Sequence, residues 1–457
     1  MKLDPAIFRD YDIRAVIPDQ LDEQGMARIA QAIIHVFKPK SIQVGHDMRL
    51  TSPQLHQVFI NTFLASGVNV VNLGLTATDM TYYAAGTYQE DMAVTISASH
   101  NPPEFNGLKI VKQGAIAVSG DSGIYDIRDA AVSEKNLTIK APAPGKLTQR
   151  HILPGWVDHA LKFIHLDKIK PFKVVIDAGN GMAGHFMPAF EKKLPWQVTR
   201  LYYQLDGSFP NHTPNPIKPE NMQDTINKVK QLKADVGMGF DGDGDRVSLV
   251  DETGRIVSGT IMTAIIAENL LQKHPQDTIL YNAIVGRVVP EIINQHQAKP
   301  IRVRVGHTLI KEAMRKHNGL FCGEHSGHYF FRDNFYADSA IIAVLLVLEL
   351  MSEKNLKLSQ LVAQYDKYPA SGEINFEVAD KQKVIQAIEA EYKNQADSID
   401  RLDGISIWFK DWWANVRPSN TESLLRLNLE ADNQTILKQK TAEFVKTIET
   451  LGGKRKT

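Results

Sequence analysis

Three aspartates stand at alternate positions in one short segment, Gly239–Arg246 (GFDGDGDR). Asp241, Asp243 and Asp245 directly follow an apolar run, Val236–Phe240, that is typical of a buried strand. Carboxylates that converge in a single loop repel one another unless a cation lies among them. Oxygen ligands favour Mg²⁺, whose shell a phosphate oxygen would complete. The spacing therefore predicts a hard-metal site at the end of a strand.

Two other interpretations of this segment are rejected. An EF-hand loop needs glycine at its sixth position, where Arg246 stands, although Glu252 does occupy the twelfth. The predicted flanking elements are also strands rather than helices. Gly237–Gly242 matches the dinucleotide-binding pattern GxGxxG, but no helix is predicted to follow it. A plain surface turn remains the alternative, and charge repulsion disfavours it.

A second segment, Thr95–Lys109 (TISASHNPPEFNGLK), carries a candidate nucleophile. The prolines that follow Ser99 forbid a helix, so its hydroxyl is expected at a rigid turn after a strand. Asn106-Gly107 is predicted to form a hairpin-type turn that returns Lys109 to Ser99. Lys109 and His100 would then supply the cations that a phosphorylated serine needs. A Pro-containing surface turn stays open, whereas the absence of GxSxG disfavours a serine hydrolase.

A third segment, Gly323–Phe330 (GEHSGHYF), combines groups that read hydroxyls. Glu324 can accept hydrogen bonds from adjacent sugar hydroxyls, and Ser326 can contribute another. His328 could donate to phosphate or move a proton. Cys322, His325 and His328 also have a spacing that a transition metal could use, but no fourth ligand is evident in the sequence. An ordinary glycine-rich turn is an equally open interpretation of this segment alone.

The fourth segment, Arg417–Arg426 (RPSNTESLLR), resembles a grip for a phosphate dianion. A forked guanidinium with short hydroxyl and amide donors suits that ligand. Its candidate residues are Arg417, Ser419, Asn420, Thr421 and Arg426. A plain Ser-Asn-Thr turn is the alternative, and the lack of GxxxxGK[ST] disfavours nucleotide-type phosphate binding. A nucleophile, a metal site, a hydroxyl reader and a phosphate grip together predict phosphoryl transfer on a sugar phosphate.

Composition narrows the class of protein. The chain has 457 residues with 43% hydrophobic and 23% charged residues, which is ordinary for a globular protein of several domains. Lysine plus arginine and aspartate plus glutamate both total 52, so charge gives no reason to expect a nucleic-acid or membrane partner. The N-terminus lacks the apolar core of a signal peptide, and a lone Cys322 fits a reducing compartment. We therefore expect a cytoplasmic protein.

The elements that must position these segments follow an α/β rhythm. Ala340–Leu348 is too short to cross a bilayer and is predicted to be a buried helix. Val247–Val250 and Arg255–Val257 are predicted to form a hairpin, and the parallel rhythm stops near Ser371. Other predicted strands are Ser41–Val44, Val68–Leu73, Ala93–Ser97, Lys173–Asp177, Thr278–Asn282, Glu373–Val378, Ile405–Phe409, Ala414–Pro418 and Leu424–Leu429. Predicted helices are Pro53–Ser66, Val157–Phe163, Thr225–Leu232, Ile261–Gln272, Thr308–Lys316 and Gln434–Leu451. The expected division is 1–145, 146–256, 257–368 and 369–457.

The four segments, in this order, closely resemble the α-D-phosphohexomutase superfamily in its bacterial phosphomannomutase/phosphoglucomutase branch. The resemblance covers nearly the whole chain. It extends to Phe8–Val16 (FRDYDIRAV), Val44–Pro53 (VGHDMRLTSP), Asp206–Asn221 (DGSFPNHTPNPIKPEN) and Val305–Met314 (VGHTLIKEAM). It implies three related α/β domains with mixed sheets and a smaller C-terminal α+β domain around a central cleft. These domains would carry, in order, the phosphoserine, metal, sugar-recognition and phosphate-binding loops.

The resemblance also implies an intramolecular phosphotransferase that interconverts hexose 1-phosphate and hexose 6-phosphate, with mannose or glucose as the sugar. A phosphoserine and a hexose 1,6-bisphosphate would be intermediates, and Mg²⁺ the metal. The implied catalytic residues are Ser99, His100, Lys109, Arg246 and His328, and the implied metal ligands are Ser99, Asp241, Asp243 and Asp245. The implied substrate-binding residues are Tyr11, Arg14, His307, Glu324, Ser326, His328, Arg417, Ser419, Asn420, Thr421 and Arg426. The partners would be sugar phosphates alone, with the protein a monomer or weak dimer.

Three departures from the family pattern are modest. Ala15, His46 and His325 stand where glycine, arginine and methionine are frequent, and the last lies in the sugar-recognition segment. A phosphoglucosamine mutase and a metal-dependent sugar phosphatase remain alternatives, as does a non-catalytic sugar-phosphate-binding protein. The YDIR opening and the GEHSGH segment, rather than a GTDGIRG-like start and GEQSGH, disfavour the first.

Overall fold

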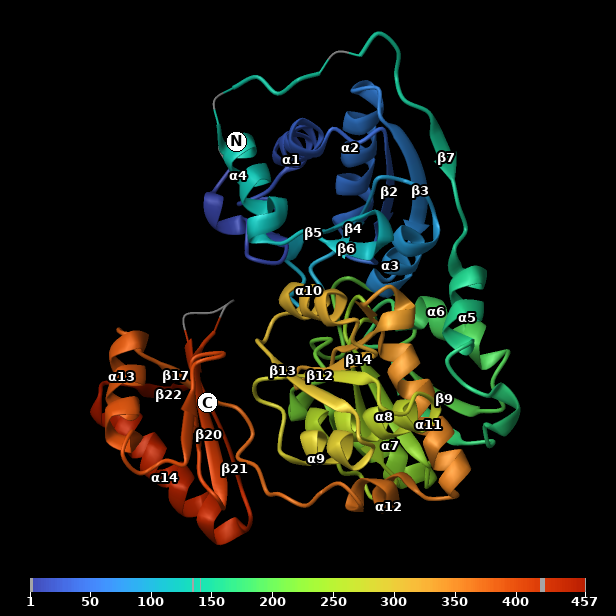
Figure 1. The fold of residues 1–457 in the computed structure, drawn as a ribbon. Helices are drawn as coiled ribbons and strands as arrows, with labels where there is room; N and C mark the ends of the chain where they lie inside the picture. Colours follow the sequence, from blue (N-terminus) through green and yellow to red (C-terminus); the bar gives the residue numbers. More distant parts are fainter. Residues whose placement is uncertain (1–2, 134, 140, 420–423, 457) are drawn as a thin grey trace.

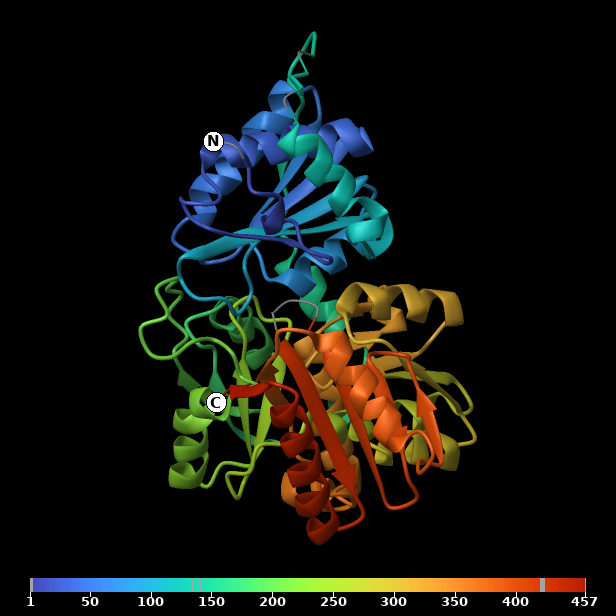
Figure 2. The same ribbon diagram turned by 90° about the vertical axis from the view of Figure 1, so that its left-hand side faces the viewer.

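The structure is a computed structural model that describes residues 3–133, 135–139, 141–419 and 424–456. Within these residues, four β-sheets follow one another along the chain. In Figure 1 the first sheet and its helices lie at the top, in blue to teal, above the green second and yellow-to-orange third parts. The red C-terminal part lies beside them, and Figure 2 turns it toward the viewer.

The first sheet has the strand order β1-β5-β4-β2-β3-β7, with β6 pairing to β5. Its strands β4, β2, β3 and β7 run parallel, while β5 runs antiparallel to β4 and β1. The helices α1, α2 and α4 bury their apolar residues on one face, and α3 packs on the other. The strands are β1 Ile13–Val16, β2 Ser41–His46, β3 Asn69–Leu75, β4 Met92–Ile96, β5 Phe105–Lys112, β6 Ile116–Ala117 and β7 Leu147–Gln149. The helices are α1 Glu23–Phe37, α2 Ser52–Ala65, α3 Thr78–Thr87 and α4 Tyr125–Val132.

The second sheet has the order β11-β10-β8-β9, with β11 antiparallel to its neighbour and the other pairs parallel. Its elements are α5 Leu153–Leu161, β8 Lys173–Asp177, α6 Ala183–Glu191, β9 Gln197–Leu201, α7 Gln223–Leu232, β10 Val236–Phe240 and β11 Val247–Asp251. The predicted hairpin of Val247–Val250 with Arg255–Val257 is present in a short form: a single antiparallel bridge joins Ile256 to Val250, and the Asp251 and Val257 N–H groups donate to the Arg255 and Leu249 carbonyls at 2.9 and 2.8 Å. β11 also pairs along its length with β10, so the aspartate segment is the connection of a second hairpin.

The third sheet has the order β13-β12-β14-β15-β16 and changes from parallel to antiparallel at β14. Helix α11 is buried from Ala340 to Ser352, as predicted, and shares one apolar core with α8 and the second sheet. The strands are β12 Thr278–Asn282, β13 Lys299–Val303, β14 Phe321–Gly323, β15 Tyr329–Phe331 and β16 Ala337–Asp338. The helices are α8 Gly259–Lys273, α9 Val288–Gln295, α10 His307–His317, α11 Ala340–Lys354 and α12 Leu358–Ala363.

The C-terminal sheet is antiparallel throughout, with the order β18-β19-β20-β21-β17-β22. Arg287–Glu430 and Arg302–Asp400 ion pairs, 3.0 and 2.6 Å long, join it to the third part. Its elements are β17 Ile374–Glu377, α13 Lys381–Tyr392, β18 Ser398–Asp400, β19 Ile405–Trp408, β20 Trp412–Pro418, β21 Leu424–Ala431, α14 Gln434–Thr450 and β22 Lys454–Lys456. Within the described part of the chain, no helix has the length and apolarity to cross a membrane. The predicted fold class is confirmed.

Candidate active site

Ser99 lies just after β4 in a backbone conformation that serine seldom adopts. Its φ is +52°, and its side chain is buried. Such a conformation costs free energy and persists only where the surroundings hold it. The Ser99 hydroxyl donates to Asp241 Oδ2 at 2.9 Å and lies 3.2 Å from His100 Nδ1. Burial and the charges of Arg246 and Arg14 lower the pKa of His100 well below its ordinary value, so the imidazole beside the hydroxyl is neutral.

Arg49 holds the backbone of this turn. Its guanidinium is fully buried and donates to the carbonyl oxygens of Ser99 at 2.8 Å, Pro102 at 2.7 Å and Phe105 at 2.8 Å. A further bond reaches the carbonyl of Asn101 at 2.5 Å. Sequence reasoning assigned Arg49 no role. The only signal was its place in the segment Val44–Pro53, which carried part of the family resemblance.

Lys109 reaches the site by a route that differs from the predicted one. The Asn106-Gly107 turn is wrong, because both residues lie inside β5. The strand runs antiparallel to β4 and places Lys109 opposite Thr95. A Cβ on Gly107 would lie 1.8 Å from the Ile13 carbonyl oxygen, so the glycine permits close approach of β1 rather than a turn.

The Lys109 ammonium lies between two of the four predicted metal ligands. Its Nζ donates to Asp243 Oδ2 at 2.7 Å and to Asp245 Oδ2 at 2.6 Å. Burial opposes the charge on this lysine, but the two aspartates outweigh burial and raise its pKa well above the ordinary value. Lys109 is therefore a fixed cation at the junction of the first and second parts of the molecule.

The aspartate loop approaches Ser99 closely because it contains Gly242. A Cβ at that position would lie 2.5 Å from the Ser99 carbonyl oxygen. Asp241, Asp243 and Asp245 are buried, and their nearest ligand atoms lie within 4.8 Å of one another. Burial raises the pKa of Asp241 well above its ordinary value, and the charges of Asp243 and Asp245 raise it further. The loop therefore concentrates negative charge that a cation would offset.

The donor atoms fit a hard divalent cation. The Oδ1 atoms of Asp243 and Asp245 are buried; the first has no hydrogen-bond partner among the described residues, and the second lies 3.5 Å from His328 Nε2. Thr78, at the start of α3, donates to the other Asp243 oxygen and helps to fix it. Asp245, His328 and Asp338 form a second possible ligand group, but Asp338 pairs with Lys311 at 2.7 Å. The oxygen-only group suits Mg²⁺ better.

The loop between β14 and β15 brings three predicted residues together. The Glu324 backbone N–H donates to the His328 carbonyl at 2.9 Å, and Gly327 turns the loop at a φ of +84°. His328 Nδ1 lies 3.1 Å from Glu324 Oε2 and 3.0 Å from Ser326 Oγ. Burial opposes ionisation of Glu324, but the hydrogen bond and charge of His328, together with Ser326 and Arg246, outweigh it and lower the carboxyl pKa to about 2.

The other nitrogen of His328 faces the aspartate loop. Its Nε2 lies 3.1 Å from Arg246 Nε and 3.5 Å from Asp245 Oδ1. Burial and Arg246 disfavour protonation of this imidazole, yet Asp245 and Glu324 outweigh them and raise its pKa to about 9. A neutral His328 accepts from Arg246, whereas a protonated His328 donates to Asp245. The ring can thus hold or move a proton within the site.

Tyr11, Arg14 and His307 border the same group. Arg14 Nη1 donates to the Ala98 carbonyl at 3.3 Å and to the Asn101 side chain, so it lies against the serine turn. The Tyr11 and His307 rings meet edge to face with centroids 5.3 Å apart, and His307 lies 6.4 Å from His328 by the same measure. Residues from three sheets therefore converge around Ser99.

The predicted phosphate grip is separate from this group. Arg417 is the next-to-last residue of β20, and Arg426 lies opposite it on β21. Both guanidinium groups contact Glu373, at 3.2 and 3.3 Å. Glu373 and Arg417 act electrostatically on His325, whose pKa is lowered mainly by burial. The grip therefore faces the β14–β15 loop.

The structure describes only the two ends, Ser419 and Leu424, of the segment that forms the tip of the grip. The Ser419 backbone N–H donates to the Leu424 carbonyl at 2.8 Å. Asn420 and Thr421 lie outside the described residues. Their role therefore stays a prediction from the sequence.

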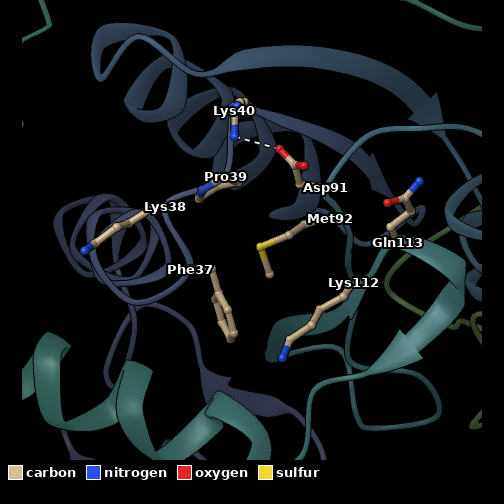
Figure 3. A pocket seen from close by; sticks show the side chains of 8 residues that line it. All are labelled: Phe37, Lys38, Pro39, Lys40, Asp91, Met92, Lys112 and Gln113. Carbon is tan, nitrogen blue, oxygen red and sulfur yellow. Dashed lines mark hydrogen bonds between the residues drawn. The ribbon is translucent and has the colours of Figure 1, made fainter.

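A surface hollow on the first part of the molecule lies apart from these residues. Figure 3 shows its lining, which is Phe37, Lys38, Pro39, Lys40, Asp91, Met92, Lys112 and Gln113. The Asp91 carboxylate already accepts from the Lys40 and Ser41 backbone N–H groups at 2.7 and 3.0 Å. The hollow contains no predicted site residue, and we assign it no role.

A buried serine beside a carboxylate cluster, fixed cations and a proton-carrying histidine defines an enzyme of phosphoryl transfer. Models of the phosphoglucomutase/phosphomannomutase family match the chain in four consecutive pieces. The alpha/beta/alpha domains I, II and III match residues 5–135, 154–254 and 258–368, and the C-terminal domain matches residues 373–447.

Relatives of the whole chain agree with these matches. A phosphomannomutase of Vibrio cholerae is 37% identical, over 97% of this chain and 98% of the relative. Phosphohexose mutases of Xanthomonas campestris are 36% identical, over 96% of this chain and 98% of the relative. The crystal structure of a family protein from Burkholderia thailandensis has a TM-score of 0.89 and 29% identity, covering 98% of each chain. The chain belongs to the phosphoglucomutase/phosphomannomutase family. It is a phosphohexomutase, an intramolecular phosphotransferase of the isomerase class.

Proposed function

We propose that the enzyme interconverts the 1-phosphate and 6-phosphate of mannose and of glucose through a phosphoserine at Ser99. The observation that carries this proposal is the contact of the Ser99 hydroxyl with Asp241 at 2.9 Å, beside the Lys109 ammonium that bridges Asp243 and Asp245. An oxygen nucleophile so placed would have a metal and a cation against the phosphoryl group it carries.

In the first transfer, the free hydroxyl of a bound hexose phosphate attacks the phosphorus of phospho-Ser99. A new sugar O–P bond forms as the Ser99 Oγ–P bond breaks, and the hydroxyl proton passes to a base in the site. The product is hexose 1,6-bisphosphate. After it turns around, its other phosphoryl group returns to Ser99 by the reverse steps, and the isomeric monophosphate leaves.

The charged side chains have different roles in the transfer. Lys109 keeps its proton and stabilises negative charge on the transferring oxygens, since its pKa is raised. Arg246 lies between Asp241 and His328, 3.8 and 3.1 Å from their nearest atoms, and neutralises charge there. His328 exchanges a proton with the reacting hydroxyl, and the neutral His100 exchanges one with Ser99 Oγ.

Asp241, Asp243, Asp245 and the Ser99 phosphate would hold Mg²⁺. The metal would supply Lewis-acid stabilisation of the phosphoryl oxygens. The Asp243 Oδ1 atom, which has no hydrogen-bond partner among the described residues, supports this ligand set.

Substrate recognition uses the other two loops. Glu324 and Ser326 would read the O3 and O4 hydroxyls, and Tyr11, Arg14 and His307 would line the approach to Ser99. The grip, formed by Arg417, Ser419, Asn420, Thr421 and Arg426, would hold the phosphate that does not react. Glucose and mannose share configuration at O3 and O4, so dual use is expected.

We also propose that the four domains are 1–145, 146–256, 257–368 and 369–457, and that the protein acts in the cytoplasm as a monomer or weak dimer. The four successive sheets support the division, although β7 (Leu147–Gln149) pairs with the first sheet. The buried free Cys322 supports a reducing compartment. Light scattering after gel filtration tests the oligomeric state.

Mass spectrometry tests the phosphoserine. Enzyme treated with glucose 1,6-bisphosphate should gain the mass of one phosphoryl group, and Ser99→Ala should gain none and lose turnover. A mutase assay run beside a phosphate-release assay separates the mutase from a phosphatase, because a mutase releases little free phosphate. Full activity of Ser99→Ala, or phosphate release at the mutase rate, contradicts the proposal.

Initial rates test the sugar. We expect kcat/KM for glucose 1-phosphate and mannose 1-phosphate to agree within about a hundredfold, because no residue described here is built to reject one epimer at C2. Glucosamine 1-phosphate should be a poorer substrate, and Glu324→Ala should impair both preferred sugars similarly. A loss confined to one sugar would show that C2 is read directly.

A further inference from the structure

Glu373 places a carboxylate inside the predicted phosphate grip. It directly follows Gly372, which has a φ of +68°, and precedes β17, at the point where the chain enters the C-terminal sheet. Its Oε2 lies 3.2 Å from Arg417 Nη2, and its Oε1 lies 3.3 Å from Arg426 Nη1. One carboxylate thus bridges two arginines on neighbouring strands.

An anion shared between the two arginines stabilises them. Arg417 and Arg426 are direct partners in the register of β20 and β21, and like charges placed opposite each other on a sheet repel. The Arg417 side chain is 3% exposed, so its charge is costly without a counter-ion. Gly404 permits close packing against Arg417, because a Cβ there would lie 2.7 Å from the Arg417 Cβ.

We propose that Glu373 is an internal anion that competes with the substrate phosphate for Arg417 and Arg426 and so weakens the grip. This inference rests on the proposed function, in which these arginines bind the phosphate that does not react. A phosphate dianion either displaces the carboxylate or binds beside it. In both cases the Glu373 charge opposes anion binding.

The competition suits a reaction whose intermediate must turn around. The bisphosphate has to leave the grip once in each catalytic cycle, and a buried arginine left without a partner would make that step costly. Glu373 keeps the buried Arg417 guanidinium paired while the phosphate is away. The grip can therefore release and recapture phosphate without leaving an unpaired buried charge.

Binding of inorganic phosphate tests the competition without relying on turnover. Glu373→Gln keeps the shape of the side chain and removes its charge. We expect calorimetry to show about threefold to tenfold tighter phosphate binding than in the parent, the effect of one charge removed from a partly exposed site. Phosphate should also raise the melting temperature of this variant more than that of the parent.

Two further variants make the result specific. Glu377→Gln, at the end of β17 with its side chain 62% exposed, is the matched control and should leave phosphate binding unchanged. Adding Arg417→Ala should abolish the gain from Glu373→Gln. Unchanged binding in Glu373→Gln overturns the proposal, and weaker binding overturns it by showing that Glu373 only orients the arginines. Tighter binding in a protein that lacks mutase activity would support the competition and refute the proposed reaction instead.

Discussion

The Ser99 turn and the C-terminal grip are both candidate phosphate sites, yet they are built differently. Ser99 is buried, and Arg49 fixes its turn through bonds to the backbone carbonyls of Ser99, Asn101, Pro102 and Phe105. The grip presents Arg417 and Arg426 from two strands of a separate sheet, and its bridging partner is the single carboxylate of Glu373. Hydrogen bonds to the backbone hold the first site in place. The second site is held by side-chain ion pairs whose anion can be exchanged.

The difference follows from what each site must do. A transferring phosphoryl group needs its nucleophile and its stabilising charges held in place before the reaction starts. A phosphate that only anchors the substrate must be gripped and released again. Substitutions in the first site should therefore lower kcat, and substitutions in the second should act mainly on KM.

Removing one charge from the aspartate loop should have the largest effect. Asp243→Asn retains the side-chain shape but loses a metal ligand charge and the ion pair to Lys109 at 2.7 Å. We expect kcat to fall by roughly a hundredfold or more, with little change in melting temperature. Treatment of the parent with EDTA should cause a comparable loss that added Mg²⁺ reverses. A parent enzyme that keeps its rate in EDTA would refute the metal assignment.

Truncating the grip should have a smaller effect, and mainly on binding. Arg417→Ala removes a charge-assisted contact worth about 1.5–3 kcal/mol, or roughly ten- to hundredfold in kcat/KM. Most of that loss should come from KM, with a lesser fall in kcat because the anchored phosphate also positions the reacting end. Arg401→Ala, at a 71% exposed arginine of the same sheet region, is the control. Equal kcat/KM in Arg417→Ala and the parent would place the grip elsewhere.

Loosening the serine turn should give the opposite split. Arg49→Lys keeps the positive charge but cannot reach all the carbonyl oxygens that the guanidinium binds. We expect kcat to fall by about tenfold while KM changes little, because the hydroxyl is displaced but the substrate contacts remain. Melting temperature and steady-state kinetics measured together separate displacement from unfolding. A raised KM with an unchanged kcat would show that Arg49 serves substrate binding.

The sequence predicted the residues that carry the chemistry better than the residues that hold them in place. The aspartate spacing and the strand before it predicted the carboxylate cluster, because carboxylates at alternate positions of one short loop must lie close together. The route of Lys109 was mispredicted, since Asn106-Gly107 has the local composition of a turn. Long-range pairing of β5 with β4 and β1 overrode that local preference.

Arg49 shows why the remainder could not be predicted. Its partners are carbonyl oxygens some fifty residues away along the chain, between Ser99 and Phe105. Backbone acceptors exist at every residue, so no residue type marks them in a sequence. Glu373 is similar, because its role depends on the register that sets Arg417 opposite Arg426.

The two sites should also differ slightly in their response to acid. His56, on α2, packs behind β2, the strand that leads into Arg49, with its Nε2 3.4 Å from the Val44 carbonyl. Burial lowers the pKa of His56 from 6.5 to about 4, and the neighbouring His46 adds to this effect. The unfolded chain therefore binds a proton on His56 below about pH 6.5, whereas the folded chain binds it only below about pH 4. Stability should fall as the pH drops through that window.

The expected effect is the smallest of the four. Between pH 7 and 5.5 the loss from His56 should be about 1 kcal/mol, which lowers the melting temperature of a chain of this length by about 1 °C. His56→Gln removes the titrating group, so the melting temperature of this variant should fall less over the same range, with kcat/KM at pH 7 close to that of the parent. His317→Gln, at an exposed histidine, should keep the parent's pH dependence. Equal losses of stability in His56→Gln and the parent would show that the acid sensitivity arises from other groups. Protonation of His56 would then not affect the structure that supports the Ser99 turn.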